Sequence, residues 1–109
     1  MNNDPSKLKM YICVKQSIPS HKVLGVAHGV LMAHLSFNNH FESYNDWLSK
    51  SFRKVVCEVT DEEFENLKKE RINYVVVTES GLGGIEIALV FCPIYDYPKM
   101  FKFFPLLKA

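Results

Sequence analysis

Residues 20–37, SHKVLGVAHGVLMAHLSF, decide the fold of this chain, because they predict one long helix that is apolar on two sides. Ser20 is a good N-cap, since its hydroxyl can accept a hydrogen bond from a first-turn backbone N–H. At about 100° per residue, Leu24, Leu31 and Leu35 form one stripe. A second stripe lies roughly opposite and consists of Val23, Val26, Val30, Ala33 and Phe37. We therefore expect two surfaces to cover this helix: a sheet, and either a further helix or a second subunit.

Small residues and histidines interrupt the apolar pattern of this helix. Gly25, Gly29 and Ala33 recur every four residues along one flank, where missing side chains allow a close backbone approach. Together with the all-round apolar surface, this flank suggests a partner surface and hence a homodimer. His21 and His28 are seven residues apart and share a face. The start of the helix is therefore the first place to expect chemistry.

The segments on either side of this helix alternate between strand and helix patterns. We expect strands over residues 9–15, 53–59, 74–78 and 85–92, and helices over residues 41–51, 60–71 and about 97–104. Thr60 and Glu63 predict a capping box at the start of the third helix. Residues 1–7 are expected to be frayed. The order β-α-α-β-α-β-β-α predicts an α/β fold of one domain, residues 1–109, with a four-stranded mixed sheet and helices on both faces.

Composition narrows the class of protein. The 109 residues are 48% hydrophobic and carry a net charge of +1, so charge alone gives no argument for nucleic acid binding. The three cysteines, Cys13, Cys57 and Cys92, lie far apart in apolar runs, which predicts buried free thiols rather than a disulfide framework or a zinc site. No signal peptide and no membrane-spanning tract are evident. We expect a soluble, cytoplasmic protein.

Three places carry candidate chemistry. His28 lies within the long helix, and its alternative role is a satisfied histidine of the core. Glu79 follows a buried strand and opens the segment ESGLGG, which predicts a tight hairpin more strongly than a phosphate cradle because no P-loop lysine or helix follows. His21 and Lys22 stand beside Ser20 at a helix start, where free N–H groups favour an anion.

Several motifs also occur in a characteristic order along the chain. Trp47 precedes the strand KVVCEV, residues 54–59, and the acidic-capped segment TDEEF, residues 60–64, comes directly after it. The next strand leads to Glu79, Ser80 and Gly81, and the last strand ends at Pro93. In this order, from residue 9 to about 107, the chain resembles the type II (archaeal and eukaryotic) peptidyl-tRNA hydrolase family.

That resemblance implies a small, usually dimeric α/β fold that hydrolyses the ester joining a peptide to tRNA. It implies no cofactor and no metal. The catalytic positions would be His28, Glu79 and His21, and the partner would be tRNA or a nucleotide. The groups that would bind phosphate or RNA are Lys22, Ser20 and Lys15. The loop after the third strand would use Gly81 and Gly83.

A second function stays open, because some family positions carry different residues here. The family's mid-helix glutamine falls on Gly25, and its threonine and glutamine after the loop glycine fall on Gly83 and Gly84. The alternative is a catalytically inactive relative: a dimeric module that binds a nucleotide, RNA or a protein.

Overall fold

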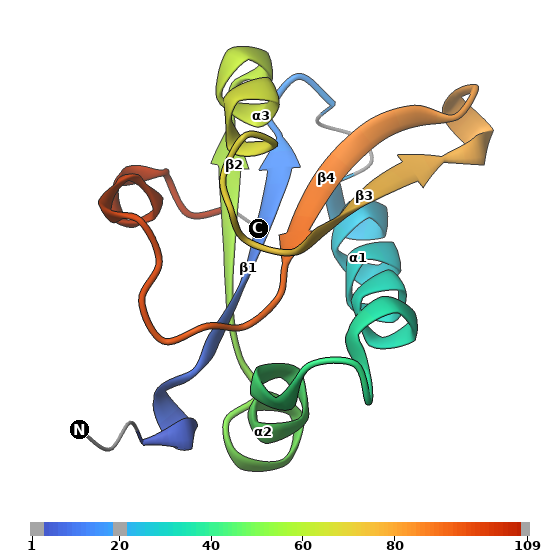
Figure 1. Cartoon of the computed structure of the whole chain (residues 1–109). Coiled ribbons are helices and arrows are strands. Elements are labelled where there is room, and N and C mark those ends of the chain that lie inside the picture. Colours follow the sequence, from blue (N-terminus) through green and yellow to red (C-terminus); the bar gives the residue numbers. More distant parts are fainter. Residues whose placement is uncertain (1–3, 19–21, 108–109) are drawn as a thin grey trace.

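The computed structural model describes residues 4–18 and 22–107, and a four-stranded sheet forms its centre (Figure 1). The strands are β1 (Lys9–Lys15), β2 (Arg53–Val59), β3 (Tyr74–Glu79) and β4 (Ile85–Phe91), in the spatial order β2-β1-β4-β3. β1 pairs with β2 in parallel, whereas β4 runs antiparallel to both β1 and β3. The expected mixed sheet is confirmed.

Helices cover both faces of the sheet. α1 (Lys22–Phe37) and α2 (Glu42–Lys50) pack on one face, and α3 (Asp61–Leu67) packs on the other. Alternation along β1 explains this arrangement, because successive side chains of a strand point to opposite faces. Met10, Ile12 and Val14 belong to the core beneath α1, whereas Tyr11 and Cys13 belong to the core beneath α3.

Only one of the two apolar stripes of α1 is buried by the sheet. Val26, Val30, Ala33 and Phe37 pack in the core. Leu24, Leu31 and Leu35 are 44%, 57% and 66% exposed. α2 does not cover them, because its buried residues Tyr44 and Trp47 join the core instead.

The small flank of α1 faces the sheet, so its assignment to a partner surface is wrong. A Cβ added at Gly29 would lie 2.7 Å from Cγ2 of Val90, closer than real Cβ contacts come. A Cβ added at Gly25 would lie 3.3 Å from Cδ1 of Ile87, and Ala33 is fully buried. The sequence period places these residues on one flank, but it does not tell which neighbour that flank meets.

The side chains of Thr60, Glu63 and Trp47 make specific hydrogen bonds in the other two helices. Thr60 and Glu63 form the capping box: Oγ1 of Thr60 accepts from Glu63 N–H at 3.1 Å, and Oε1 of Glu63 accepts from Thr60 N–H at 2.8 Å. Trp47 is a packing anchor, since it is 1% exposed and its indole N–H donates to the carbonyl of Arg53 at 2.7 Å.

Three elements differ in kind or by several residues from the expectations, and other boundaries differ by a residue. Residues Pro5–Lys7 form a short 3-10 turn capped by Asp4, where a frayed start was expected. α3 ends at Leu67, although its charged pattern continues to Arg71. The last expected helix is a 3-10 turn, Lys99–Phe103, because prolines at 98 and 105 bracket it. The expected N-cap Ser20 lies outside the described residues.

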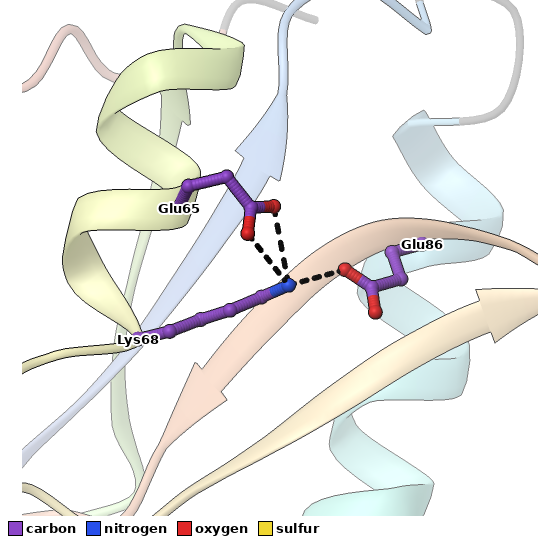
Figure 2. A network of polar contacts seen from close by, with 3 residues as sticks. All are labelled: Glu65, Lys68 and Glu86. Carbon is purple, nitrogen blue, oxygen red and sulfur yellow. Dashed lines mark hydrogen bonds and ion pairs between the residues drawn. The ribbon is translucent and has the colours of Figure 1, made fainter.

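Polar contacts tie the end of α3 to the sheet (Figure 2). The ammonium of Lys68 donates to both carboxylate oxygens of Glu65 and to Glu86 on β4. The hydrogen bond to Glu86 raises the pKa of Lys68 above its ordinary value. These contacts join α3 to the strand beneath it.

The two edges of the sheet differ. At the β2 edge, the C-terminal segment runs alongside the strand: Glu58 N–H donates to the carbonyl of Pro105 at 2.8 Å, and Leu107 N–H donates to that of Val56 at 2.9 Å. β3 forms the opposite edge. In residues 4–18 and 22–107, no backbone segment pairs with its outer side.

The close approach at Gly29 predicts a stability effect. Gly29→Ala should lower the free energy of unfolding by about 1–3 kcal/mol, because the new methyl group would overlap the stiff, buried side chain of Val90. Urea denaturation would measure the change. Gly25→Ala is the matched control: it meets only the flexible end of Ile87, and alanine gains up to about 1 kcal/mol in helix propensity. Equal stabilities for the two variants would contradict the contact.

Candidate active site

The strand directions bring the candidate residues to one end of the sheet. β1 is antiparallel to β4, and β4 is antiparallel to β3, so β1 and β3 run in the same direction. The chain therefore leaves β1 for α1 at the same end of the sheet at which β3 ends in Glu79. Carboxyl ends of strands are the usual place for binding groups in α/β sheets.

His28 and Glu79 form a pair at this end of the sheet. Nδ1 of His28 lies 3.4 Å from Oε2 of Glu79. The Glu79 side chain is only 12% exposed, whereas that of His28 is 45% exposed and open to solvent. The other carboxylate oxygen, Oε1, accepts a hydrogen bond from the N–H of Gly81 at 3.0 Å. The structure thus brings together two of the three residues predicted to be catalytic.

One oxygen of the Glu79 carboxylate lies in an unusual environment. Oε2 is fully buried and has no hydrogen-bond partner among the described residues. A buried carboxylate oxygen without a donor is costly. Nδ1 of His28 lies within ion-pair distance of Oε2. A proton on Nδ1 is the donor that this oxygen lacks.

The backbone around Glu79 explains how its side chain is held. The β3–β4 register shifts between Val77 and Thr78, which marks a bulge, and bulges re-aim the side chains beside them. Directly afterwards, Glu79 caps the 3-10 turn Ser80–Leu82 through its own carboxylate. The turn ends at Gly83, whose φ of 77° lies in the left-handed region that favours glycine.

The loop glycines use their N–H groups within the loop. Gly81 donates to the Glu79 carboxylate, Gly83 to the carbonyl of Ser80 at 3.1 Å, and Gly84 to the carbonyl of Glu79 at 2.9 Å. The segment is therefore the expected tight hairpin. None of these three donors is left pointing outwards for a phosphate.

A pocket lies beside the His28–Glu79 pair, between α1 and β3. Its volume is about 260 Å³, and it is lined by His28, Leu31, Met32, Val76, Val77 and Thr78. The lining is mostly apolar, with His28 and Thr78 as its polar members. Sequence reasoning missed Thr78 and Met32. Met32 follows His28 by four residues, which puts both on one face of the helix and was the available signal.

The remaining predicted residues do not all join this site. His21 and Ser20 lie outside the described residues. Lys22 begins α1, but its side chain is not among those described. The ammonium of Lys15 lies 4.6 Å from the centre of the Phe64 ring. Because Phe64 belongs to the core beneath α3, this contact places Lys15 on the face opposite α1 and away from His28.

The cysteines are buried free thiols, as expected. Cys13 and Cys57 face each other on β1 and β2, with their sulfur atoms 3.4 Å apart. The hydrogen bond from Cys57 and burial raise the pKa of the Cys13 thiol well above its usual value. The Cys13 thiol is therefore a poor nucleophile. In the described part of the chain, no cluster of three or more metal-ligating side chains occurs.

Comparisons with known proteins add no assignment. No protein-family model matches the chain, and no sequence-similar curated protein was found. Among the described residues, no helix is long and apolar enough to cross a membrane. The evidence for function therefore comes from the site itself.

The pairing predicts which ring nitrogen of neutral His28 carries the proton. A carboxylate facing Nδ1 should hold the proton there, because the hydrogen bond at one nitrogen sets the tautomer. Ring ¹⁵N chemical shifts measured in the wild type and in Glu79→Ala would test this. We expect the Nδ1–H form to dominate in the wild type and to lose its dominance in the variant. The same tautomer ratio in both proteins would contradict the pairing.

Proposed function

We propose that this protein hydrolyses the ester between a peptide and tRNA, as a divergent relative of the type II peptidyl-tRNA hydrolases. The observation that carries the proposal is the 3.4 Å approach of His28 Nδ1 to the buried Oε2 of Glu79. A carboxylate and an imidazole in this relation form a proton-transfer unit. It stands beside a pocket and at the end of the sheet that the resemblance points to.

In this proposal Glu79 is a positioning residue and His28 is the general base. Glu79 is anchored by the N–H of Gly81 and holds the proton of His28 on Nδ1. The lone pair on Nε2 then takes a proton from a water molecule as that water attacks the ester carbonyl carbon. Histidine returns the proton to the leaving ribose oxygen when the tetrahedral intermediate collapses.

Binding of the tRNA moiety is assigned to the start of α1. A helix N-terminus attracts phosphate through its free N–H groups and dipole, and Lys22 adds a charge there. His21 and Ser20 belong to the same segment of the sequence and stay candidates for this role. Lys15, which lies over Phe64 on the other face of the sheet, is the weakest of the proposed phosphate contacts.

The alternative is a binding module without turnover. The observation that favours it is the set of glycines at 25, 83 and 84, where the resembling family has hydroxyl and amide groups. In that case the same end of the sheet would bind a nucleotide, RNA or a protein. The assay described next separates the two functions.

Hydrolysis of an N-blocked aminoacyl-tRNA by the purified protein tests the proposal. We expect turnover in the wild type, and a loss of about 10²–10⁴-fold in His28→Ala and Glu79→Gln, as is typical when proton transfer is removed. His40→Ala and Glu62→Gln are matched controls, because both residues are exposed and lie outside the pair. Their turnover should not change.

Two results would reject the enzyme. Turnover that survives in both His28→Ala and Glu79→Gln would remove the pair from the reaction. A folded wild-type protein that binds tRNA but releases no amino acid would favour the binding module.

A homodimer stays a prediction, and one of its two arguments is lost because Gly25 and Gly29 face the sheet. The exposed stripe of Leu24, Leu31 and Leu35 remains. An antiparallel contact between two copies of α1 would set Leu24 against Leu35, as a two-fold interface requires. Sedimentation equilibrium should then give about twice 12.6 kDa, and Leu35→Asp should shift the protein towards the monomer. A 12.6 kDa species at all concentrations would rule the dimer out.

A further inference from the structure

We propose that the outer edge of β3 binds the peptide part of the substrate as an added β-strand, with one apolar side chain of that peptide in the pocket between β3 and α1. This inference rests on the proposed ester hydrolysis, because it assigns the acyl half of the same substrate. It adds a binding surface and a side-chain preference that the His28–Glu79 pair alone does not define.

The open edge of β3 supplies the backbone groups for such a strand. β3 is the last strand of the sheet, and in residues 4–18 and 22–107 nothing pairs with its outer side (Figure 1). An edge strand presents a row of unpaired N–H and C=O groups, which an extended peptide can satisfy. At the opposite edge, the segment around Pro105 and Leu107 already pairs with β2. The sheet therefore has one occupied edge and one available edge.

The pocket beside this edge supplies selectivity for a side chain. Its apolar walls come from Leu31 and Met32 on α1 and from Val77 on β3. Its volume of about 260 Å³ lies just below the range of roughly 300–1,000 Å³ for pockets that hold drug-sized ligands. It therefore suits one branched or aromatic side chain. A peptide paired with a strand directs alternate side chains to one face, so one of them can enter the pocket.

The edge of β3 leads directly to the His28–Glu79 pair. β3 ends in Glu79, and the pocket includes His28. A peptide lying along β3 would therefore have one end beside the pair that handles the proton. RNA fits this surface less well, because no lysine or arginine is among the described side chains that line the pocket and phosphate binding needs cations. The chemistry thus favours the peptide half of the substrate here.

The first experiment measures binding without any reaction. The probes are the blocked tripeptides N-acetyl-Ala-Leu-Ala-amide and N-acetyl-Ala-Gly-Ala-amide, titrated into the ¹⁵N-labelled protein and followed by NMR. We expect the leucyl peptide to shift the backbone resonances of residues 74–79 and the methyl resonance of Met32. The glycyl peptide should bind about tenfold more weakly, since it leaves the apolar pocket empty.

Two variants test whether this pocket determines the preference for the peptide side chain. Met32→Ala shortens a wall of the pocket and should reduce the leucyl-over-glycyl preference by about fivefold, in binding and in the kcat/KM for blocked leucyl- and glycyl-tRNA. Met100→Ala is the matched control, because Met100 is a methionine of similar exposure, 37% against 41% for Met32, that does not line this pocket. It should keep the preference of the wild type.

The outcomes separate this inference from the proposed function. Peptide binding at β3 without hydrolysis of any ester would reject the enzyme and retain the peptide-binding edge. Hydrolysis with equal kcat/KM for both esters, and no peptide binding, would retain the enzyme and overturn this inference. It is also overturned if an acceptor-stem RNA moves the β3 resonances in place of the peptide. Shifts of the same resonances with protein concentration alone would assign the edge to a second copy and likewise overturn it.

Discussion

The contact between α1 and the sheet is the constraint on which the rest of the structure depends. Gly25 and Gly29 let the helix backbone approach β4 so closely that a methyl group at position 29 would overlap Val90. That approach sets the height of α1 above the edge of the sheet, and therefore the reach of His28 towards Glu79. The same contact leaves room for a pocket between the helix and β3. A wider helix–sheet spacing would separate the pair, so packing and chemistry here depend on one interface.

The partly satisfied carboxylate of Glu79 is the clearest departure from ordinary structural roles. One oxygen is bound by the N–H of Gly81, whereas the other is buried and lies against the ring of His28. A purely structural carboxylate at a hairpin would gain by turning both oxygens to water, because an unpaired buried acceptor is costly. The bulge before Glu79 and the 3-10 turn after it hold the side chain in this position instead. Local backbone structure thus keeps this carboxylate oxygen buried beside His28.

Sequence patterns predicted the elements but not their mutual placement. β1 and β2 begin and end where their apolar runs predict, and Thr60 caps its helix as its spacing to Glu63 requires, because these signals act over a few residues. The wrong assignment of the Gly25 flank and the distant position of Lys15 have a different origin. Both depend on which neighbour a face meets, and strand order decides that over long distances in the chain. The pairing of His28 with Glu79 was likewise visible only as two separate candidates.

Both faces of the sheet carry a buried core, but the His28–Glu79 pair lies on the α1 face alone. On the α3 face, Lys68 bridges to β4, and Tyr11, Tyr97 and Phe101 form a ring cluster whose centroids lie 4.6–5.0 Å apart. There the hydroxyl of Tyr97 donates to the carbonyl of Cys92, and the C-terminal segment closes the β2 edge. The α1 face has the opposite character, with exposed leucines, a pocket and an unpaired strand edge. A sheet so firmly fixed on one side can keep the edge of β3 open on the other, because few contacts at that edge are needed to hold the fold together. The open edge is therefore a feature that this fold can maintain, and the carboxylate at its end is where chemistry on a bound strand would occur.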